Sequence, residues 1–158
     1  MTYVMPLGAR PHHVERMDLT ITFPGTGRVD ATFGSYVVRT DRSLSHGGEG
    51  SAPEPFDMFL ASLGTCAGAY VLAFCDARGI SAADIRLLQH CSYDDAHRLE
   101  RVDIAISLPP SFPEKYRAGV RAAAEACKVK KTLASPPQLD VTTTVADAKE
   151  ASGAAGAR

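Results

Sequence analysis

Two cysteines are the residues of this chain best suited to chemistry. Cys66 lies inside a long apolar stretch, and Cys127 lies beside a group of lysines, Lys128, Lys130 and Lys131. A cysteine reacts as the thiolate, so a reactive cysteine needs neighbours that lower its pKa, and lysines could do this for Cys127. Either cysteine could instead be a small buried apolar residue. The functional question is therefore whether Cys66 and Cys127 meet in the folded protein.

The other two cysteines are expected to lie in the core. Cys75 follows Cys66 on the same predicted helix at a rise of about 13 Å, which is too far for a disulfide. Cys91 falls on a predicted strand. The sequence contains no Cys-x-x-Cys pair, and the cysteines and histidines lack zinc-site spacing, so we expect neither a metal nor another cofactor.

The elements that must position these cysteines begin with a long helix, predicted from residue 56 to about residue 78. Apolar residues recur along it at steps of three and four: Phe56, Phe59, Leu60, Leu63, Ala67, Tyr70, Val71 and Phe74. The opposite side carries small residues rather than charges, which indicates burial on most sides. Gly64 and Gly68 each cost about 1 kcal/mol relative to Ala, which indicates close packing against their face. A single domain has too few strands to cover this helix, so we predict an intimate homodimer.

Around this helix the pattern predicts strands. Apolar residues alternate from Met17 to Phe23, and residues 28–38 read as one strand or two, broken near Gly34. Further strands are predicted at 85–93, 102–108 and 139–145, with a second helix at 113–127. Strands with few helices between them favour an α+β fold. We expect a leader at 1–14, a single domain at 15–146 and a flexible tail at 147–158.

Composition excludes several classes of partner. The 158 residues, 45% apolar and 22% charged, suit one globular domain, and the net charge of −1 argues against nucleic acid. The N-terminus lacks a signal pattern, and the most apolar stretch is rich in small residues and breaks at Asp76, so we expect no membrane span and a cytoplasmic protein.

Two segments together carry a family resemblance. Gly47-Gly48-Glu49-Gly50 leads into residues 53–66 with Cys66, and Cys127-Lys128-Val129-Lys130-Lys131-Thr132-Leu133 follows later. In this order and spacing the chain resembles the OsmC/Ohr family of osmotically induced and organic-hydroperoxide-resistance proteins, from about Leu19 to Val145. It is more similar to the broad OsmC-like branch than to the dedicated hydroperoxide reductases.

The resemblance implies antiparallel or mixed sheets around the long helix, in an intertwined, swapped homodimer with active sites at the subunit interface. It implies a peroxidatic Cys66 and a resolving Cys127. In the peroxidase branches a Glu near the helix start and an Arg from the N-terminal strands hold the reactive cysteine. Here Phe56 occupies the Glu position, Asp57 is the nearest acid, and the Arg position falls near Arg28, with Arg39 and Arg42 as weaker candidates.

The implied chemistry is reduction of an organic hydroperoxide. A Cys66 thiolate would attack the O–O bond, the sulfenic acid would condense with Cys127, and a small or protein thiol would reduce the disulfide. Phe56, Phe59 and Tyr70 would favour organic over hydrogen peroxide. The alternative is a non-catalytic protein that binds a small apolar or thiol-reactive ligand, or senses redox state, at the dimer interface.

Four residues near this proposed site have equally simple structural explanations. Asp57 could serve the helix dipole, and Arg28 could be ordinary strand surface. His46 and Glu49 could line a pocket or belong to a solvated loop.

Overall fold

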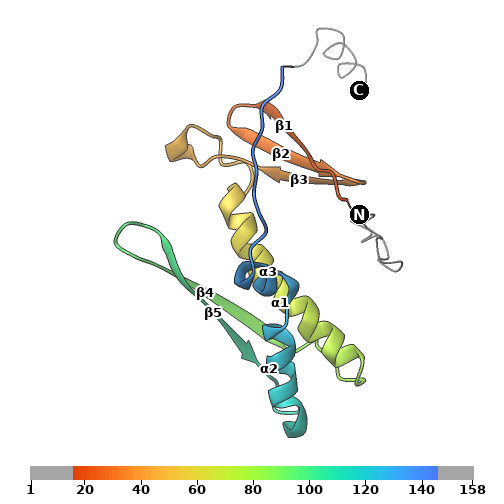
Figure 1. The fold of residues 1–158 in the computed structure, drawn as a ribbon. Coiled ribbons are helices and arrows are strands. Elements are labelled where there is room, and N and C mark those ends of the chain that lie inside the picture. Colours follow the sequence, from red (N-terminus) through yellow and green to blue (C-terminus); the bar gives the residue numbers. More distant parts are fainter. Residues whose placement is uncertain (1–15, 146–158) are drawn as a thin grey trace, which may run out of the picture. The chain divides into compact units, whose positions relative to one another are not determined.

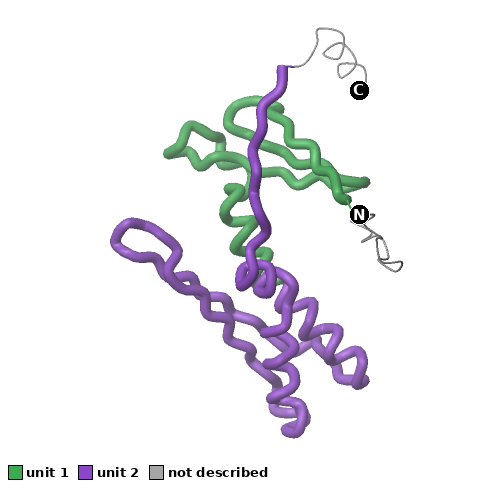
Figure 2. Tube along the Cα trace, viewed as in Figure 1, with its two compact units in different colours: residues 1–65 green, residues 66–158 purple. Residues whose placement is uncertain are grey.

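The computed structural model of this chain describes residues 16–145. The predicted leader at 1–14 and tail at 147–158 lie outside the described residues. The chain divides within its long helix into two compact units, residues up to Thr65 and residues from Cys66 onward (Figure 2). Each unit is described by itself.

The elements combine two antiparallel sheets with helices, an α+β fold (Figure 1). They are, in order, β1 (Thr20–Gly25), β2 (Arg28–Phe33), β3 (Tyr36–Thr40), η1 (Leu44–His46), α1 (Pro55–Asp76), β4 (Arg86–Tyr93), β5 (Leu99–Ser107), η2 (Glu114–Tyr116), α2 (Arg117–Glu125) and α3 (Lys128–Ala134).

The first unit contains a three-stranded antiparallel sheet in the order β1-β2-β3. β2 and β3 pair from Val29 opposite Thr40 to Phe33 opposite Tyr36, which confirms the predicted break near Gly34. β1 starts later than predicted, and its register with β2 shifts where Pro24 lacks an N–H to donate. The face predicted to be half-buried is open, and the Phe23 side chain is 80% exposed.

Helix α1 has a defined start and end. Pro55 takes the first helical position, and the Asp57 carboxylate accepts a 3.1 Å hydrogen bond from the backbone N–H of Glu54, as in a capping box. At the other end Gly79 has φ +63°, its N–H bonds to Asp76 O, and the N–H of Ile80 bonds to Cys75 O. This is a Schellman motif, which a glycine permits at low cost.

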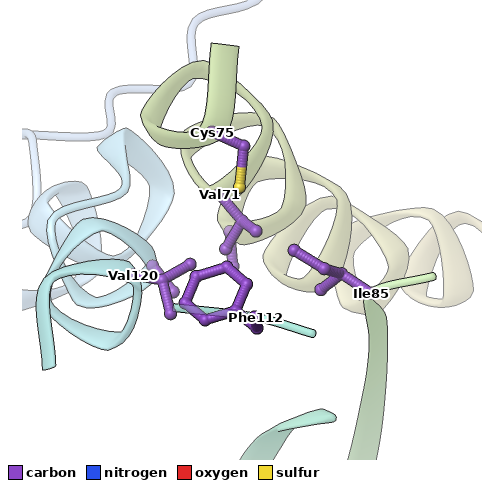
Figure 3. Close-up of a cluster of buried hydrophobic side chains, with 7 residues drawn as sticks. Val71, Cys75, Ile85, Phe112 and Val120 are labelled. Carbon is purple, nitrogen blue, oxygen red and sulfur yellow. The ribbon is translucent and has the colours of Figure 1, made fainter. Parts of the chain in front are cut away.

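The second unit has its core where α1, α2 and the β4-β5 hairpin meet (Figure 3). The hairpin pairs from Arg86 opposite Ser107 to Tyr93 opposite Leu99. The buried cluster consists of Ala67, Val71, Cys75, Ile85, Phe112, Val120 and Ala124. Burial raises the pKa of the Cys75 thiol and keeps it unreactive, which confirms Cys75 as a core residue. Cys91 lies half-buried on β4.

The strand predicted at residues 139–145 does not form within this chain. Residues 135–145 adopt neither helix nor strand, and the alternating Leu139, Val141 and Val145 are 86%, 94% and 97% exposed. An alternating segment becomes a strand only when a sheet edge pairs with its backbone and an apolar surface covers its side chains. In the structure residues 139–145 pair with none of the described strands.

Among the described residues, α1 alone has the length and apolar composition needed to cross a membrane. The sequence had suggested that no stretch would meet this condition. Length and composition do not separate a membrane span from a core helix of a soluble protein, and the later turns of α1 supply Ala67, Val71 and Cys75 to the core.

Candidate active site at Cys66 and Cys127

Cys66 lies on α1 at the start of the second unit. The core residues Ala67 and Val71 follow one another at a spacing of one helical turn, and Cys66 precedes that buried stripe by one position. Its side chain is therefore turned partly out of the core and is half-buried. A thiol in this position can be reached by other groups, whereas the buried Cys75 cannot.

Cys127 occupies the N-cap of α3. Its backbone is extended, with φ −60° and ψ 146°, and its sulfur accepts a 3.4 Å hydrogen bond from the backbone N–H of Lys130. Ser, Thr, Asp and Asn usually accept this bond at helix starts, and here a sulfur does so. The side chain is fully buried. The cap fixes the position of Cys127 relative to the first turn of α3.

The two cysteines meet at this helix start. The backbone N–H of Val129 hydrogen-bonds the Cys66 sulfur and lowers the pKa of the Cys66 thiol, which partial burial alone would raise. A hydrogen bond with the Cys127 side chain lowers this pKa further, and so do the backbone N–H and the positive charge of Lys128. All four cysteines of the chain are free thiols in the structure.

This arrangement supports redox chemistry of the pair. Groups that stabilise the Cys66 thiolate raise the fraction of the nucleophilic form at neutral pH. A second thiol within hydrogen-bonding distance can form a disulfide of about 2.05 Å after a small movement. The structure therefore brings together the two cysteines that the sequence singled out.

The charge of Lys128 acts on Cys66, which is far from it in the sequence. From the sequence, Lys128 and its neighbours could lower the pKa of Cys127 or could form a solvated face. In the structure the charge of Lys128 lowers the pKa of Cys66, because Cys66 lies against the first turn of α3. Residues that are adjacent in the sequence therefore do not show which side chain on another helix a charge will contact.

Arg28 and Asp57, the other predicted site residues, have local partners in the first unit. The Arg28 guanidinium forms an ion pair with Asp30 on the same strand, with the Asp30 side chain only 11% exposed. Asp57 is engaged in the α1 cap. Their roles at the cysteines stay predictions.

A buried acid that the sequence analysis missed organises the loop before α1. Asp41 is 1% exposed. Its carboxylate accepts hydrogen bonds from the backbone N–H and hydroxyl of Ser51, at 2.9 and 2.8 Å, and from the N–H of Glu49. The Ser51 bonds are the main reason that the pKa of Asp41 is lowered. An Asp at a strand end before a Gly- and Ser-rich loop is the signal that points to such a turn.

The same loop requires one of its glycines. A Cβ at Gly48 would lie 1.9 Å from the carbonyl oxygen of Arg42, so no other residue fits without moving the backbone. Gly48 and Asp41 together hold the Gly47-Gly48-Glu49-Gly50 segment in a single shape.

His46 belongs to a surface network. Its Nδ1 lies 2.8 Å from Ser43 Oγ and 3.5 Å from Glu54 Oε1. A serine nucleophile with a His–acid pair would use both ring nitrogens, and here one nitrogen faces both partners, so the geometry does not fit such a triad. The His46 side chain is 72% exposed and Glu49 is also exposed, which favours the solvated-loop interpretation of both.

Within residues 16–145, no group of three or more His, Cys, Asp or Glu side chains could hold a metal ion.

Comparison with known proteins agrees with this architecture. A family model described as OsmC-like protein matches residues 48–142, and comparison with curated proteins found no significant match. Similar solved structures include a Psychrobacter arcticus 273-4 protein described as an osmotic stress induced and detoxification response protein, with TM-score 0.62 and 23% identity over 72% of this chain and 85% of that one. An OsmC like protein from Mycoplasma pneumoniae has TM-score 0.60 and 14% identity, over 78% of this chain and 90% of that one.

Proposed function

Because this chain belongs to the OsmC-like protein family, we propose that it is a thiol-dependent peroxidase that reduces organic hydroperoxides through Cys66 and Cys127. The observation that carries the proposal is the lowered pKa of Cys66 beside a second free thiol. The chain has the α+β fold of this family, with antiparallel sheets and a long helix.

The proposed reaction has three balanced steps. The Cys66 thiolate attacks the terminal oxygen of the hydroperoxide, the O–O bond breaks, and the alkoxide leaves and takes a proton from water to become the alcohol. Cys66 is now a sulfenic acid. The Cys127 sulfur attacks it, the S–O bond breaks, water leaves and a disulfide forms. Two external thiols then reduce the disulfide by exchange and are themselves oxidised to a disulfide.

The start of α3 supports the first and second steps. The N–H of Val129 and the charge of Lys128 stabilise the attacking thiolate. The cap bond from Lys130 holds the Cys127 sulfur next to Cys66, so the sulfenic acid has a partner before a second peroxide can oxidise it further. To assist in this chemistry, the Arg28 guanidinium would have to break its ion pair with Asp30.

We also propose that two copies assemble into an intertwined homodimer. Three open surfaces support this: the alternating segment at 139–145, the uncovered apolar face of β1, and the small-residue side of α1. A Cβ at Gly68 would meet no atom within 4 Å in the single chain, whereas the sequence indicates close packing there. A second copy would supply both the missing packing and a strand neighbour for residues 139–145.

Two observations favour a second candidate, a redox sensor or ligand-binding protein. Phe56 occupies the position where hydroperoxide reductases place Glu, and Arg28 is engaged by Asp30. A protein with a reactive thiol pair but without an Arg at the site would form the disulfide yet turn over slowly.

OsmC-like proteins are soluble, and we place either form in the cytoplasm, where free thiols persist.

One experiment tests the proposal and separates the two candidates. The protein is treated with one equivalent of cumene hydroperoxide, and the cysteines are mapped by mass spectrometry. We expect a Cys66–Cys127 disulfide, and finding both thiols still reduced would reject the redox function. Peroxide consumption is then followed with excess dithiothreitol. Rapid, repeated turnover supports the peroxidase, and slow turnover supports the sensor.

A further inference from the structure

A cavity of about 310 Å³ in the second unit lies outside the cysteine site. It opens between one face of β5 and the helices α2 and α3. It is lined by Ile104, Ile106, Leu108, Arg117, Val120, Arg121, Ala124, Glu125 and Lys130. Neither Cys66 nor Cys127 lines it.

The floor of the cavity is apolar. Ile104, Ile106 and Leu108 alternate along β5 and its end, so they share one face of the hairpin. Val120 and Ala124 are one helical turn apart on α2, and both are buried in the core, with exposures of 1% and 4%. A ligand that entered here would therefore find an aliphatic surface for an apolar tail.

The rim is positively charged. It carries Arg117, Arg121 and Lys130 against a single acid, Glu125. Arg117 is paired with Glu114 at 2.9 Å, outside the cavity lining, and Arg121 lies 3.5 Å from Glu125. Lys130 is half-buried and forms no ion pair with any residue in the described part of the chain. An anionic group at the rim would give Lys130 an ionic partner, which residues 16–145 do not supply.

We propose that this cavity binds a small molecule with an unbranched apolar tail and a carboxylate head. The tail would lie on the aliphatic floor, and the head would accept a charge-assisted hydrogen bond from Lys130, with Arg121 nearby. At about 30 Å³ for each non-hydrogen group, the cavity holds about ten such groups, the size of octanoate. A larger ligand would have to project into solvent.

The position of Lys130 connects the cavity with the thiol pair. Lys130 lines the cavity, and its backbone N–H donates the hydrogen bond to the Cys127 sulfur. A ligand held by Lys130 would restrain the first turn of α3, and the Lys130 amide signal should report that binding. The inference does not rest on the proposed peroxidase, because binding is measured on the reduced protein without peroxide.

The test is a titration of the reduced, full-length protein with octanoate, followed by ¹H–¹⁵N correlation spectra and by isothermal titration calorimetry. We expect saturable binding, with amide shifts concentrated in residues 104–108 and 117–130. Octanol keeps the tail and lacks the charge, and octylamine has the opposite charge. Both should bind about tenfold or more weakly than octanoate, because each loses the charge-assisted hydrogen bond.

Matched variants locate the head group. Lys130→Met keeps the side-chain length and removes the charge. It should therefore weaken the binding of octanoate about tenfold and leave the binding of octanol unchanged. Lys131→Met changes an exposed lysine on the same helix that does not line the cavity, and should leave both unchanged. The proposal is overturned if octanoate does not saturate, if octanol binds equally well, or if both variants behave alike. Should Lys130→Met unfold, the wild-type amide shifts and the octanol comparison still decide the matter.

Discussion

The sulfur of Cys66 accepts a hydrogen bond from the backbone N–H of Val129, a residue of α3 that is far from Cys66 in the sequence. This bond is the largest cause of the lowered pKa of Cys66, and it exists because Cys127 caps α3 and turns the first N–H groups of that helix toward α1. A small cap therefore links the fold of the C-terminal helices to the reactivity of a thiol on the central helix.

Replacing Cys127 should separate the two steps of the proposed chemistry. Cys127→Ser keeps the Cys66 nucleophile and removes its resolving partner, so one equivalent of hydroperoxide should still be consumed. Further peroxide should carry Cys66 on to the sulfinic acid, which mass spectrometry detects. Cys91→Ser is the control, because Cys91 lies half-buried on β4, where its sulfur accepts a hydrogen bond from the side-chain amide of Gln89. If Cys127→Ser resists over-oxidation as the wild type does, Cys127 is not the resolving residue.

Removing the charge of Lys128 should raise the pKa of Cys66. In the wild type this pKa is lowered, so the rate of alkylation by iodoacetamide should rise with pH through a midpoint below the usual value of about 8.5 and then level off. In Lys128→Met the curve should move to higher pH, and the rate at pH 7 should fall about two- to fivefold, as a solvent-screened charge contributes up to about 1 kcal/mol. The remaining backbone N–H bonds limit the effect. An unchanged profile, equal to that of Lys131→Met, would show that this charge does not act on Cys66.

The Asp41 carboxylate should make stability depend on pH in acid. Its folded pKa is lowered, so its contribution is complete above the unfolded pKa of about 3.9 and is lost as pH falls through the folded value. Asp41→Asn should therefore unfold at lower denaturant concentration at pH 7, and the difference from wild type should shrink as the pH falls below about 4. Asp95→Asn, at an exposed position in the hairpin turn, should show no such difference. A gap between wild type and Asp41→Asn that stays constant down to the lowest pH would contradict this role.

The core of the second unit should be sensitive to the loss of Phe112. Its side chain is 4% exposed and packs in the cluster with Val71 and Val120 (Figure 3). Phe112→Ala should lower the free energy of unfolding by about 3–5 kcal/mol, measured by urea denaturation. Phe23→Ala, at an 80% exposed position of the single chain, is a comparison that also tests the dimer. Phe23→Ala should lower the free energy of unfolding only slightly in a monomer, and more if a second copy covers β1.

The segment at 139–145 gives a sharper test of the homodimer. Val141 is 94% exposed, so Val141→Asp cannot disturb the packing of a single chain. If this side of the segment lies against a second copy, the variant should sediment as a monomer at micromolar concentration, where the wild type is a dimer. Thr142→Asp places the same charge on the opposite side of an extended segment and should remain dimeric. A monomeric wild type would refute the assembly.

Much of the fold could be read from local patterns. The spacing of apolar residues predicted α1 to within a few residues, and alternation predicted β4 and β5, because each pattern reflects one face of one element. The strand start at Met17 and the strand at 139–145 were wrong within the single chain. An alternating pattern shows that one face of a segment is apolar. It does not show whether another part of the same chain packs against that face.

The sequence by itself determined which residues could do chemistry: Cys66 on an apolar helix and Cys127 beside a group of lysines. It also predicted that Cys75 lies in the core. Only the tertiary structure decided that Cys66 meets Cys127, that the charge of Lys128 acts on Cys66, and that Asp41 holds the glycine-rich loop. The physical reason is the sequence separation over which each property is set. Helical and strand periodicity follow from neighbours a few residues apart. The pKa of a thiol depends on which hydrogen-bond donors reach its sulfur when two helices that are far apart in the sequence pack together.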